Sequence, residues 1–402
     1  MGLIDFDSGP TEVDGPELGE SDGAGLEPIR GRLATLGRPH TPGDVADAMR
    51  AEGLVVSDAT VIETVESLRR NSIGAGELDG LLRVRGVTDI LVNGPDQVFI
   101  DRGAGLELTD VRFGSDAAVR RLAQRLAATV GRRLDDAQPF VDARLGDGCR
   151  VHAVLGAVAA PGTCISLRVP AKRTFSLGDC VRTGSMSAGT AQLLRRIVDA
   201  RLAFLISGGT GSGKTTLLAA LLALVPGNER IVVVEDSREL APDHPHVVRM
   251  EGRPANAERV GAISLTDLVR QSLRMRPDRL VVGEVRGGEI CDLLTAMNTG
   301  HEGGCGTVHA NSAADVPARL EALAALGGLG RAALHAQLAS ALHAVVHVLR
   351  DDRGRRRVGE IAVLVRDELS GLVRTERAVH FAGDGRTELG PGSERLEQVL
   401  GR

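Results

Sequence analysis

The feature that most constrains this chain is the stretch from Leu202 to Leu217, which reads LAFLISGGTGSGKTTL. An apolar run of strand length, Leu202–Ile206, leads into a glycine-rich turn that ends in Lys214 and Thr215, and an apolar run of helical length follows. The pattern G-x-x-x-x-G-K-[ST] between a strand and a helix is typical of a phosphate-binding loop. The sequence therefore predicts a site for a nucleoside triphosphate.

Each residue of this loop has an expected role. The glycines let backbone N–H groups turn toward a phosphate chain that lies against the start of the following helix. We expect Lys214 to reach the β- and γ-phosphates and the Thr215 hydroxyl to hold Mg²⁺. The predicted ATP-binding residues are Gly208, Gly209, Thr210, Gly211, Ser212, Gly213, Lys214, Thr215 and Thr216.

The choice of cations supports this interpretation. The chain contains only two lysines, Lys172 and Lys214, and uses arginine for every other cationic side chain. A planar guanidinium cannot replace the compact ammonium that a phosphate loop requires. A glycine-rich helix cap with a chance lysine is the alternative, and it explains this pattern poorly.

Composition sets the general class of protein. With 402 residues, 43% of them hydrophobic and 25% charged, the chain can form two or three globular domains. The net charge of -5 gives no overall attraction to nucleic acid, and the absence of Trp and Tyr removes the usual stacking surfaces for single strands. We find neither a signal peptide nor an apolar run of spanning length, and the five separated cysteines favour reduced thiols, so we expect a cytoplasmic protein.

The first half of the chain divides into four expected regions. Residues 1–28 are rich in Gly, Pro and acidic side chains and predict a disordered acidic tail. Residues 29–82 carry helical patterns, which favour a helical bundle or a spacer equally. Turn signals and short alternating runs predict an α+β domain over residues 83–170, and residues 171–188 are interpreted as a linker.

In the second half, strands and helices alternate, as a parallel-sheet α/β core requires. This domain is predicted over residues 189–366. Within it we expect a loop between Glu235 and Arg253, a helix over Arg331–Val345 and a closing strand at Val358–Val365. Residues 367–402 are interpreted as a C-terminal tail.

Acidic residues follow two of the predicted strands. Glu235 ends the run IVVVE, and Glu284 follows RLVVG, where Gly283 replaces the aspartate usual before this glutamate. Ligands of α/β sheets bind at the carboxyl ends of strands, so both carboxylates can hold Mg²⁺ or orient an attacking water. Surface or helix-capping glutamates are the alternative.

A glycine-rich segment, HEGGCGTVHANS, carries His301 and His309. The spacing of its carboxylate and thiol is wrong for a zinc site. A neutral imidazole that senses the γ-phosphate through a hydrogen bond fits the segment better than two unspecialised loop histidines.

Four segments in this order resemble the Walker A, Asp-box, Walker B and His-box motifs of the type II/type IV secretion ATPase superfamily: GGTGSGKTT, VVVEDSREL, LRMRPDRLVVGEVRGGE and TGHEGGCGTVHANS. Upstream, VTDILVNGPDQVFIDRG, DARLGDGCRVHAV and CISLRV resemble the N-terminal domain of its branch for tight-adherence (Flp) pili and conjugal-transfer-type systems. The resemblance covers roughly Leu78 to Val365. It implies an α/β fold with a RecA-like P-loop domain at the C-terminal side, a smaller α+β domain before it and a helical N-terminal extension.

The resemblance also implies roles for single residues. His309 is the His-box histidine that approaches the γ-phosphate, and Arg150 and Arg168 are arginines of the N-terminal domain that close over the phosphates. Arginine suits this role because its charge is permanent and its fork matches phosphate oxygens. The implied Mg²⁺ residues are Thr215, Glu235 and Glu284. The implied catalytic residues are Glu284, Glu235, His309, Arg150, Arg168, Arg276 and Arg286.

The resemblance further implies a homohexameric ring that hydrolyses ATP to drive pilus assembly or protein secretion. Such a motor works at the inner face of the cell membrane, bound to the platform proteins of the machine and to no stable nucleic acid. The zinc-binding tetracysteine element of some type II relatives is absent here. Two alternatives stay open: a DNA-translocating conjugation ATPase, and an ATP-binding scaffold with little turnover. The direction of force, extension or retraction, is also open.

Overall fold

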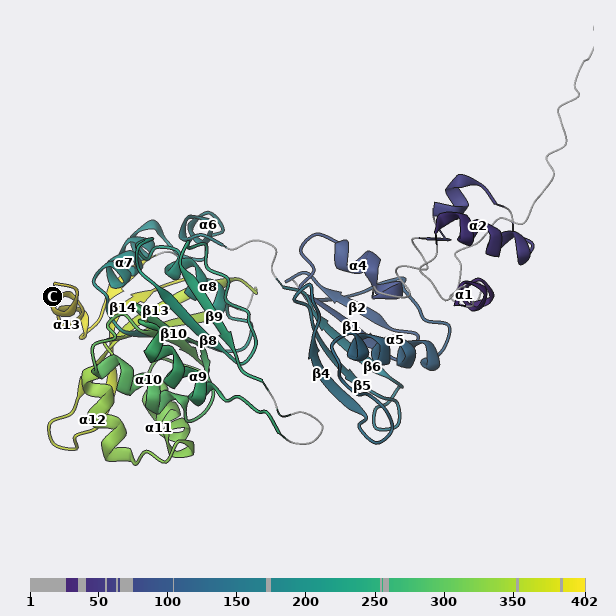
Figure 1. Ribbon diagram of the computed structural model, residues 1–402. Helices are drawn as coiled ribbons and strands as arrows, with labels where there is room; N and C mark the ends of the chain where they lie inside the picture. Colours follow the sequence, from purple (N-terminus) through teal and green to yellow (C-terminus); the bar gives the residue numbers. More distant parts are fainter. Residues whose placement is uncertain are drawn as a thin grey trace, which may run out of the picture. The chain divides into compact units, whose positions relative to one another are not determined.

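The computed structural model describes residues 27–34, 41–54, 56–62, 64–65, 75–103, 105–170, 175–253, 255, 260–351, 354–383 and 386–401. These residues form two compact units, Met1–Ala171 and Lys172–Arg402, which we describe separately (Figure 1). Most of the predicted acidic tail, residues 1–26, lies outside the described residues.

The first unit begins with a small helical part. Helices α1 (Glu27–Ala34) and α2 (Pro42–Ala51) share a core that contains Ile29, Val45 and Met49. The Thr41 side chain accepts a hydrogen bond from the backbone of Asp44, and the Asp44 carboxylate accepts one from the backbone of Thr41, which fixes the start of α2. The short helices η2 (Gly76–Leu78) and α4 (Asp79–Arg83) lead into the sheet.

An antiparallel sheet forms the main body of this unit, in the order β3-β2-β1-β6-β5-β4. Helix α5 (Asp116–Thr129) contributes Val119, Leu122 and Leu126 to the core that this sheet shares. The strands are β1 (Asp89–Asn93), β2 (Val98–Asp101), β3 (Leu106–Leu108), β4 (Phe140–Arg144), β5 (Arg150–Val154) and β6 (Cys164–Arg168). This is the predicted α+β arrangement, with β3 and β4 as strands that the sequence pattern did not predict.

The second unit is built on a sheet in the order β15-β14-β13-β12-β7-β11-β10-β8-β9. From β12 to β9 the neighbours are parallel, whereas β13, β14 and β15 add on in antiparallel pairs. The strands are β7 (Phe204–Ser207), β8 (Ile231–Glu235), β9 (Val247–Glu251), β10 (Arg279–Val285), β11 (Cys305–Val308), β12 (Ala344–Arg350), β13 (Arg356–Arg366), β14 (Val373–Phe381) and β15 (Thr387–Leu389).

Helices cover both faces of this sheet (Figure 1). Alternate residues of β7 point to opposite faces, so Ile206 packs with one group of helices and Leu205 with the other. The first group is α6 (Leu177–Arg182), α7 (Ala188–Asp199) and α8 (Lys214–Leu222). The second is α9 (Leu265–Ser272) with the η3 turn (Leu273–Met275), α10 (Glu289–Asn298), α11 (Val316–Leu326) and α12 (Arg331–Ala341).

Several expected boundaries were wrong. The presumed linker 171–188 contains α6, whose start is fixed by the Ser176–Asp179 capping box. The predicted helix over Arg331–Val345 ends at Ala341, because β12 begins at Ala344. Strand β9 lies inside the expected loop before Arg253, since it completes the edge of the sheet beside β8.

The expected C-terminal tail, residues 367–402, is also folded. It forms β14, β15 and helix α13 (Ser393–Leu400). The buried side chains of Val379, Phe381, Leu396 and Val399 join the core on the side of α7, so this segment extends the sheet beyond the predicted closing strand.

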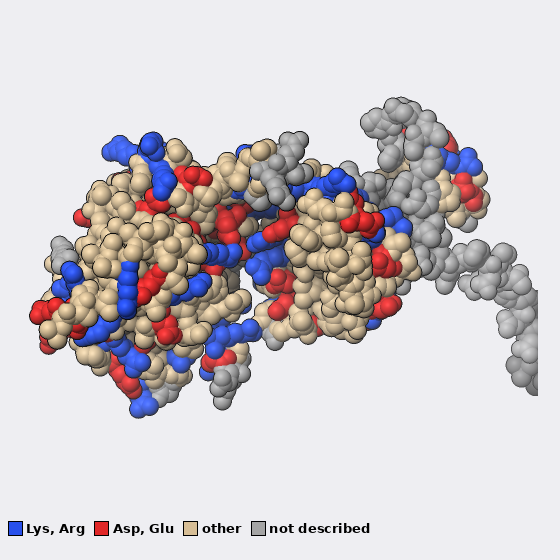
Figure 2. All heavy atoms as spheres, turned by 90° about the horizontal axis from the view of Figure 1, so that it is seen from below, with Lys and Arg blue, Asp and Glu red and all other residues tan. Residues whose placement is uncertain are grey.

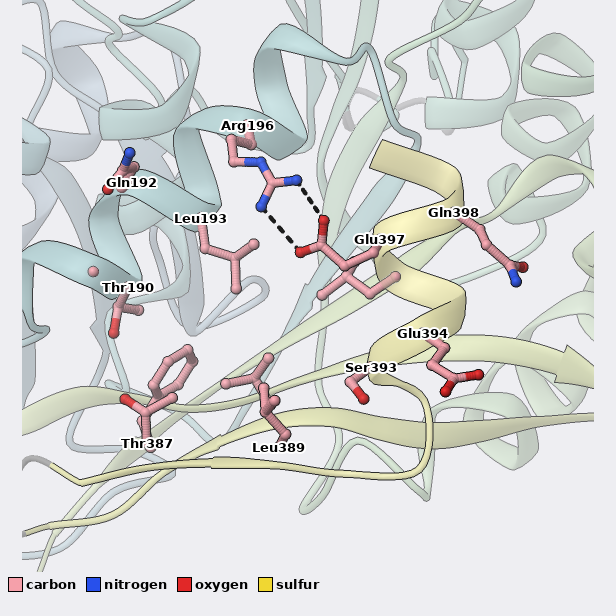
Figure 3. A pocket seen from close by; sticks show the side chains of 14 residues that line it. Thr190, Gln192, Leu193, Arg196, Thr387, Leu389, Ser393, Glu394, Glu397 and Gln398 are labelled. Carbon is pink, nitrogen blue, oxygen red and sulfur yellow. Dashed lines mark hydrogen bonds and ion pairs between the residues drawn. The ribbon is translucent and has the colours of Figure 1, made fainter. Parts of the chain in front are cut away.

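A groove of about 950 Å³ lies between α7, β14, β15 and α13 (Figure 3). Arg196 of α7 and Glu397 of α13 face each other across it, with nitrogen–oxygen distances of 3.0 and 2.6 Å. The residues that line the groove include none of the predicted nucleotide-binding or catalytic residues.

The surface carries both signs of charge. On the face shown in Figure 2, arginine and carboxylate side chains are interspersed over each unit. Among the helices of the described residues, none combines the length and the apolar character that a membrane crossing requires.

We expect Arg279→Ala to lower the free energy of unfolding of the second unit by about 3 kcal/mol. The Arg279 side chain is 3% exposed, and its Nε lies 2.6 Å from the carboxylate of Glu229, which is 13% exposed. Removing the guanidinium leaves the largely buried carboxylate of Glu229 with only one of these two ion-pair partners, Arg201 at 2.7 Å. Urea unfolding followed by far-ultraviolet circular dichroism measures the change, because the chain has no Trp or Tyr.

Arg270→Ala is the matched control. Its ion pair with Asp292 has a length of 2.8 Å, but the Arg270 side chain is 59% exposed. We expect a loss below about 1 kcal/mol for this variant. Equal losses in the two variants would contradict the importance that we assign to burial of Arg279.

Candidate functional site

The predicted motif residues of the second unit meet at one edge of its sheet. Strands β7, β11, β10 and β8 are neighbours and run in the same direction, so their carboxyl ends share an edge. The phosphate loop follows β7 and His309 follows β11. Glu284 is the last residue but one of β10, and Glu235 is the last residue of β8. Lys214 and His309, which are 95 positions apart along the chain, are thereby brought into contact.

Two glycines give the phosphate loop its shape. Gly208 has a φ of 154°, and a Cβ atom there would lie 2.2 Å from the carbonyl oxygen of Val348 on β12. Gly213 has a φ of 97°, in the left-handed region, and is the N-cap of α8. A side chain at either position would shift the backbone, which explains why the loop requires glycine there.

The ammonium group of Lys214 is the buried charge of this loop. The residue is 7% exposed, and its Nζ donates to the carbonyl oxygens of Gly208 at 3.0 Å and Gly209 at 2.9 Å. Nζ also lies 3.3 Å from Nδ1 of His309. Burial is the largest influence on Lys214 and lowers its pKa. The loop carbonyls and the histidine therefore accept the hydrogen bonds that the Lys214 ammonium donates. A bound phosphate can accept these hydrogen bonds in their place.

A continuous series of hydrogen bonds extends from Lys214 across the site. Nε2 of His309 lies 2.7 Å from Oε1 of Glu284, and Oε2 of Glu284 lies 2.6 Å from the Arg286 guanidinium. The other terminal nitrogen of Arg286 contacts Asp236 at 2.7 Å. The series joins the Walker A, His-box, Walker B and Asp-box segments into one network.

The network fixes the protonation states of its members. Lysine can only donate, so Nδ1 of His309 accepts and Nε2 carries the proton that is donated to Glu284. Burial, followed by the charge of Lys214, lowers the pKa of His309 and keeps its ring neutral. Burial acts to raise the pKa of Glu284, but the hydrogen bond and charge of Arg286, with His309 and Lys214, outweigh it and lower this pKa. Glu284 is therefore ionised beside a neutral imidazole.

Glu235 has a different environment. It is 3% exposed, and its Oε1 accepts hydrogen bonds from the backbone N–H groups of Glu239 and Leu240, at 2.9 and 2.8 Å. Its Oε2 accepts no hydrogen bond from any described residue and lies 3.9 Å from Arg249. Burial raises the pKa of Glu235 to about 7, against the effect of the two N–H groups.

The unusual Gly283 has a steric explanation in this environment. A Cβ atom at position 283 would lie 2.5 Å from Cγ of Glu235. The aspartate expected at this point of the Walker B strand would collide with the Glu235 side chain. Its replacement by glycine gives Glu235 room to reach the edge of the sheet.

The structure separates one predicted residue from this site. Arg276 is exposed, with a φ of 53°, and precedes β10. It therefore lies at the amino end of that strand, whereas Glu284 lies near its carboxyl end. Arg286, at the other flank of β10, belongs to the network. Thr215 is half-buried and Thr216 exposed in the first turn of α8.

Arg150 and Arg168 belong to the first unit. They are direct neighbours across the β5–β6 pair and so share one face of that sheet. Arg150 forms a two-point ion pair with Asp142, at 3.0 and 2.5 Å, and Nε of Arg168 lies 3.3 Å from Asp89. Both arginine side chains stay partly exposed.

Sequence reasoning missed a second buried polar contact at the phosphate loop. The hydroxyl of Ser207, the last residue of β7, lies 2.9 Å from Nδ1 of His347 on β12, and both residues are buried. A signal was available, because His347 interrupts the otherwise apolar run AVVHVL. The predicted helix over Arg331–Val345 covered only the first two residues of that run, and no strand was predicted for the rest.

We expect the free energy of unfolding of Glu235→Gln, measured relative to that of the wild type, to increase as pH rises. In the folded chain the pKa of Glu235 is about 7 and its ordinary value is 4.5, so between these values the folded state binds the proton more tightly than the unfolded state. Proton binding to Glu235 therefore stabilises the folded wild type, and this stabilisation is lost as pH rises from 4.5 to about 7. The loss is up to about 3 kcal/mol, at about 1.4 kcal/mol per pH unit. The glutamine variant has no such proton to lose.

Urea unfolding at pH 5, 6, 7 and 8 measures this difference. Glu388→Gln is the control, since it removes the same charge from an exposed position on β15. A difference between Glu235→Gln and wild type that stays constant with pH would contradict a protonated, buried Glu235.

Comparison with known proteins agrees with the motifs and the fold. The family model described as "Type II/IV secretion system protein" matches residues 74–389. A putative conjugal transfer protein of Mycobacterium tuberculosis is 56% identical over 316 residues, which cover 77% of this chain and 90% of that protein. The probable conjugal transfer protein TrbB of Sinorhizobium fredii is 33% identical and covers 67% of this chain and 81% of its own length.

Among solved structures, the ATPase DotB of Legionella pneumophila superposes with a TM-score of 0.51 at 20% identity. The match covers 76% of this chain and 81% of DotB, and it supports the predicted fold class, an α/β P-loop domain with a smaller domain before it. Family membership follows from the length of the family match, residues 74–389, and from the 56% identity to the M. tuberculosis protein. The chain belongs to the type II/IV secretion system protein family, and it is a nucleotide-binding P-loop ATPase of that family.

Proposed function

We propose that the chain is the cytoplasmic motor of a membrane machine and that ATP hydrolysis in its second unit drives assembly of a type IV or Flp-like pilus, or protein secretion. One observation supports the hydrolytic part most strongly: the series of hydrogen bonds from Lys214 through His309 and Glu284 to Arg286 and Asp236. It couples the phosphate loop to a carboxylate and an imidazole. A scaffold that only binds ATP has no need of this coupling.

The donor set suits Mg²⁺. The Thr215 hydroxyl stands in the first turn of α8, and Glu284 is ionised at the same edge of the sheet. Oxygen ligands of this kind, completed by phosphate oxygens and water, are those that Mg²⁺ prefers. We propose Thr215, Glu284 and Glu235 as the residues that hold the ion, directly or through water. The ion would supply charge neutralisation at the β- and γ-phosphates.

The two carboxylates differ in a way that divides the catalytic work. Glu284 is ionised and hydrogen-bonded to His309, which suits it to orient the attacking water. Glu235 takes up a proton near neutral pH, so it can receive one during turnover. We propose that His309, which is neutral and in contact with Lys214, donates its Nε2–H to an oxygen of the γ-phosphate in place of Glu284.

We propose Arg150 and Arg168 as the arginines that close over the phosphates. Their present partners, Asp142 and Asp89, are half-exposed carboxylates. Exposed ion pairs of this kind contribute about 0–1 kcal/mol, so exchange for a phosphate oxygen costs little. Exchange driven by the nucleotide would move the first unit relative to the second, which is a means of converting hydrolysis into movement. No such role is supported for Arg276 within its own subunit.

The setting is proposed from the family. We propose a homohexameric ring at the inner face of the cell membrane, held there by platform proteins of a pilus or secretion system. The names of the M. tuberculosis and S. fredii relatives make conjugal transfer a second candidate. DNA-stimulated hydrolysis would favour that candidate, and hydrolysis that is independent of DNA would favour the pilus or secretion motor.

We expect Lys214→Ala to lower kcat for ATP by at least about 100-fold, because a phosphate loop without its ammonium loses charge stabilisation in the transition state.

Glu284→Gln should lower kcat by about 100-fold while the Kd for ATP stays within about threefold of wild type. Steady-state phosphate release and equilibrium binding measure these effects, with Glu388→Gln as the control. Unchanged kcat in Lys214→Ala would overturn the proposal, and unchanged kcat in Glu284→Gln would transfer the role of water orientation to Glu235.

Native mass spectrometry tests the ring. We expect a species of six chains whose population rises when ATP is added to Glu284→Gln, since this variant binds ATP without consuming it. A mass that stays at one chain under both conditions would contradict the hexamer.

A further inference from the structure

An arginine-rich hairpin lies next to the phosphate loop. It joins β12 to β13 and contains Arg350, Arg355, Arg356 and Arg357, whereas residues 352 and 353 lie outside the described residues. Strand β12 runs parallel to β7 with His347 opposite Ser207, so the residues after His347 continue past the end of β7, alongside the loop. Nothing in the four motifs of the site accounts for this cluster of positive charge.

Two contacts fix the position of the hairpin. Gly208, the first residue of the loop, approaches the carbonyl of Val348, as described above. Gly213, the last glycine of the loop, is crossed by the stem of Arg356, whose Cδ lies 3.4 Å from the place of a Cβ on Gly213. The Arg356 guanidinium, at the end of the same stem, is therefore carried by a rigid strand against the N-terminus of α8.

Arg356 differs from its neighbours in having no hydrogen-bond or ion-pair partner among the described residues. Arg355 pairs with Asp351 at 2.9 Å, Arg357 donates to the carbonyl of Phe381, and Arg350 donates to the carbonyl of Gly354. Arg356 is exposed, and no described residue forms a hydrogen bond or ion pair with its guanidinium. Its charge is therefore available to a ligand.

The order of the strands indicates which part of a nucleotide lies there. The groups that act on the γ-phosphate, His309, Glu284 and Glu235, all come from strands on one side of β7. Since the γ-phosphate lies toward those strands, the nucleoside end of the phosphate chain leaves the loop on the other side. That side is formed by β12 and the start of β13.

We propose that Arg356 binds the α,β-diphosphate of the bound nucleotide, from the side of the site opposite His309 and Glu284. This inference rests on the proposed ATP site and adds a ligand contact to it. A guanidinium suits the task because its charge is permanent and its fork fits two phosphate oxygens. The diphosphate is present in ATP, in the transition state and in ADP alike, so the contact adds to binding and leaves the chemical step unchanged.

Binding of ADP with Mg²⁺ to the full chain, measured by isothermal titration calorimetry, tests the proposal. We expect Arg356→Ala and Arg356→Gln each to raise the Kd for ADP by about tenfold or more, the effect of losing a charge-assisted hydrogen bond. Arg356→Lys should lie between these variants and wild type. In turnover, KM for ATP should rise by a similar factor with kcat within about twofold.

Arg355→Gln is the matched control, one residue away on the same hairpin and paired with Asp351; its Kd should stay within about twofold of wild type. Arg356→Gln keeps the stem over Gly213, so it separates loss of charge from loss of packing. A Kd for Arg356→Gln equal to that of wild type would overturn the proposal, as would an equal loss in Arg355→Gln. ADP binding needs no hydrolysis, so a failure here is distinct from absent turnover in the wild type, which would contradict the motor function.

Discussion

The buried ammonium of Lys214 is the charge on which the arrangement of the site depends. A cation that is 7% exposed must have its hydrogen bonds satisfied within the protein, and here two loop carbonyls and one imidazole satisfy them. Because lysine only donates, it sets the tautomer of His309, and His309 in turn donates to Glu284. The orientation of the Glu284 carboxylate on β10 thus depends on the charge of Lys214, which follows β7.

The groups of the site can approach one another because two positions at this edge of the sheet are glycines and have no room for a side chain. Gly208 lets the loop lie against β12, and Gly283 leaves space for Glu235 between β8 and β10. A side chain at either position would separate adjacent strands at their carboxyl ends, where the functional groups converge. Glycine at position 283 thus accommodates the buried glutamate on the neighbouring strand.

The sequence predicted the centre of this structure better than its margins. The apolar runs before Gly208, Glu235 and Glu284 are buried parallel strands, and such strands carry a strong local signal. At the margins, β9 is half-buried along its whole length, and β14 and β15 carry polar and charged residues on exposed positions, so the alternation of these strands is weak. Strand β12 was hidden because an apolar run that follows a helix has no period of its own. Arg276 was assigned from its place in a motif, and a motif does not state at which end of a strand a residue lies.

The two carboxylates of the site show why local motif positions do not by themselves give chemical roles. Glu284 and Glu235 both stand at the ends of neighbouring strands. A guanidinium and an imidazole contact Glu284, whereas Glu235 accepts hydrogen bonds from two backbone N–H groups and lies 3.9 Å from an arginine. One acid is thereby kept ionised and the other is held near its protonation midpoint at neutral pH. Acid–base work needs two groups whose proton affinities differ in this way, and the difference here arises from the partners that the sheet order places beside each carboxylate.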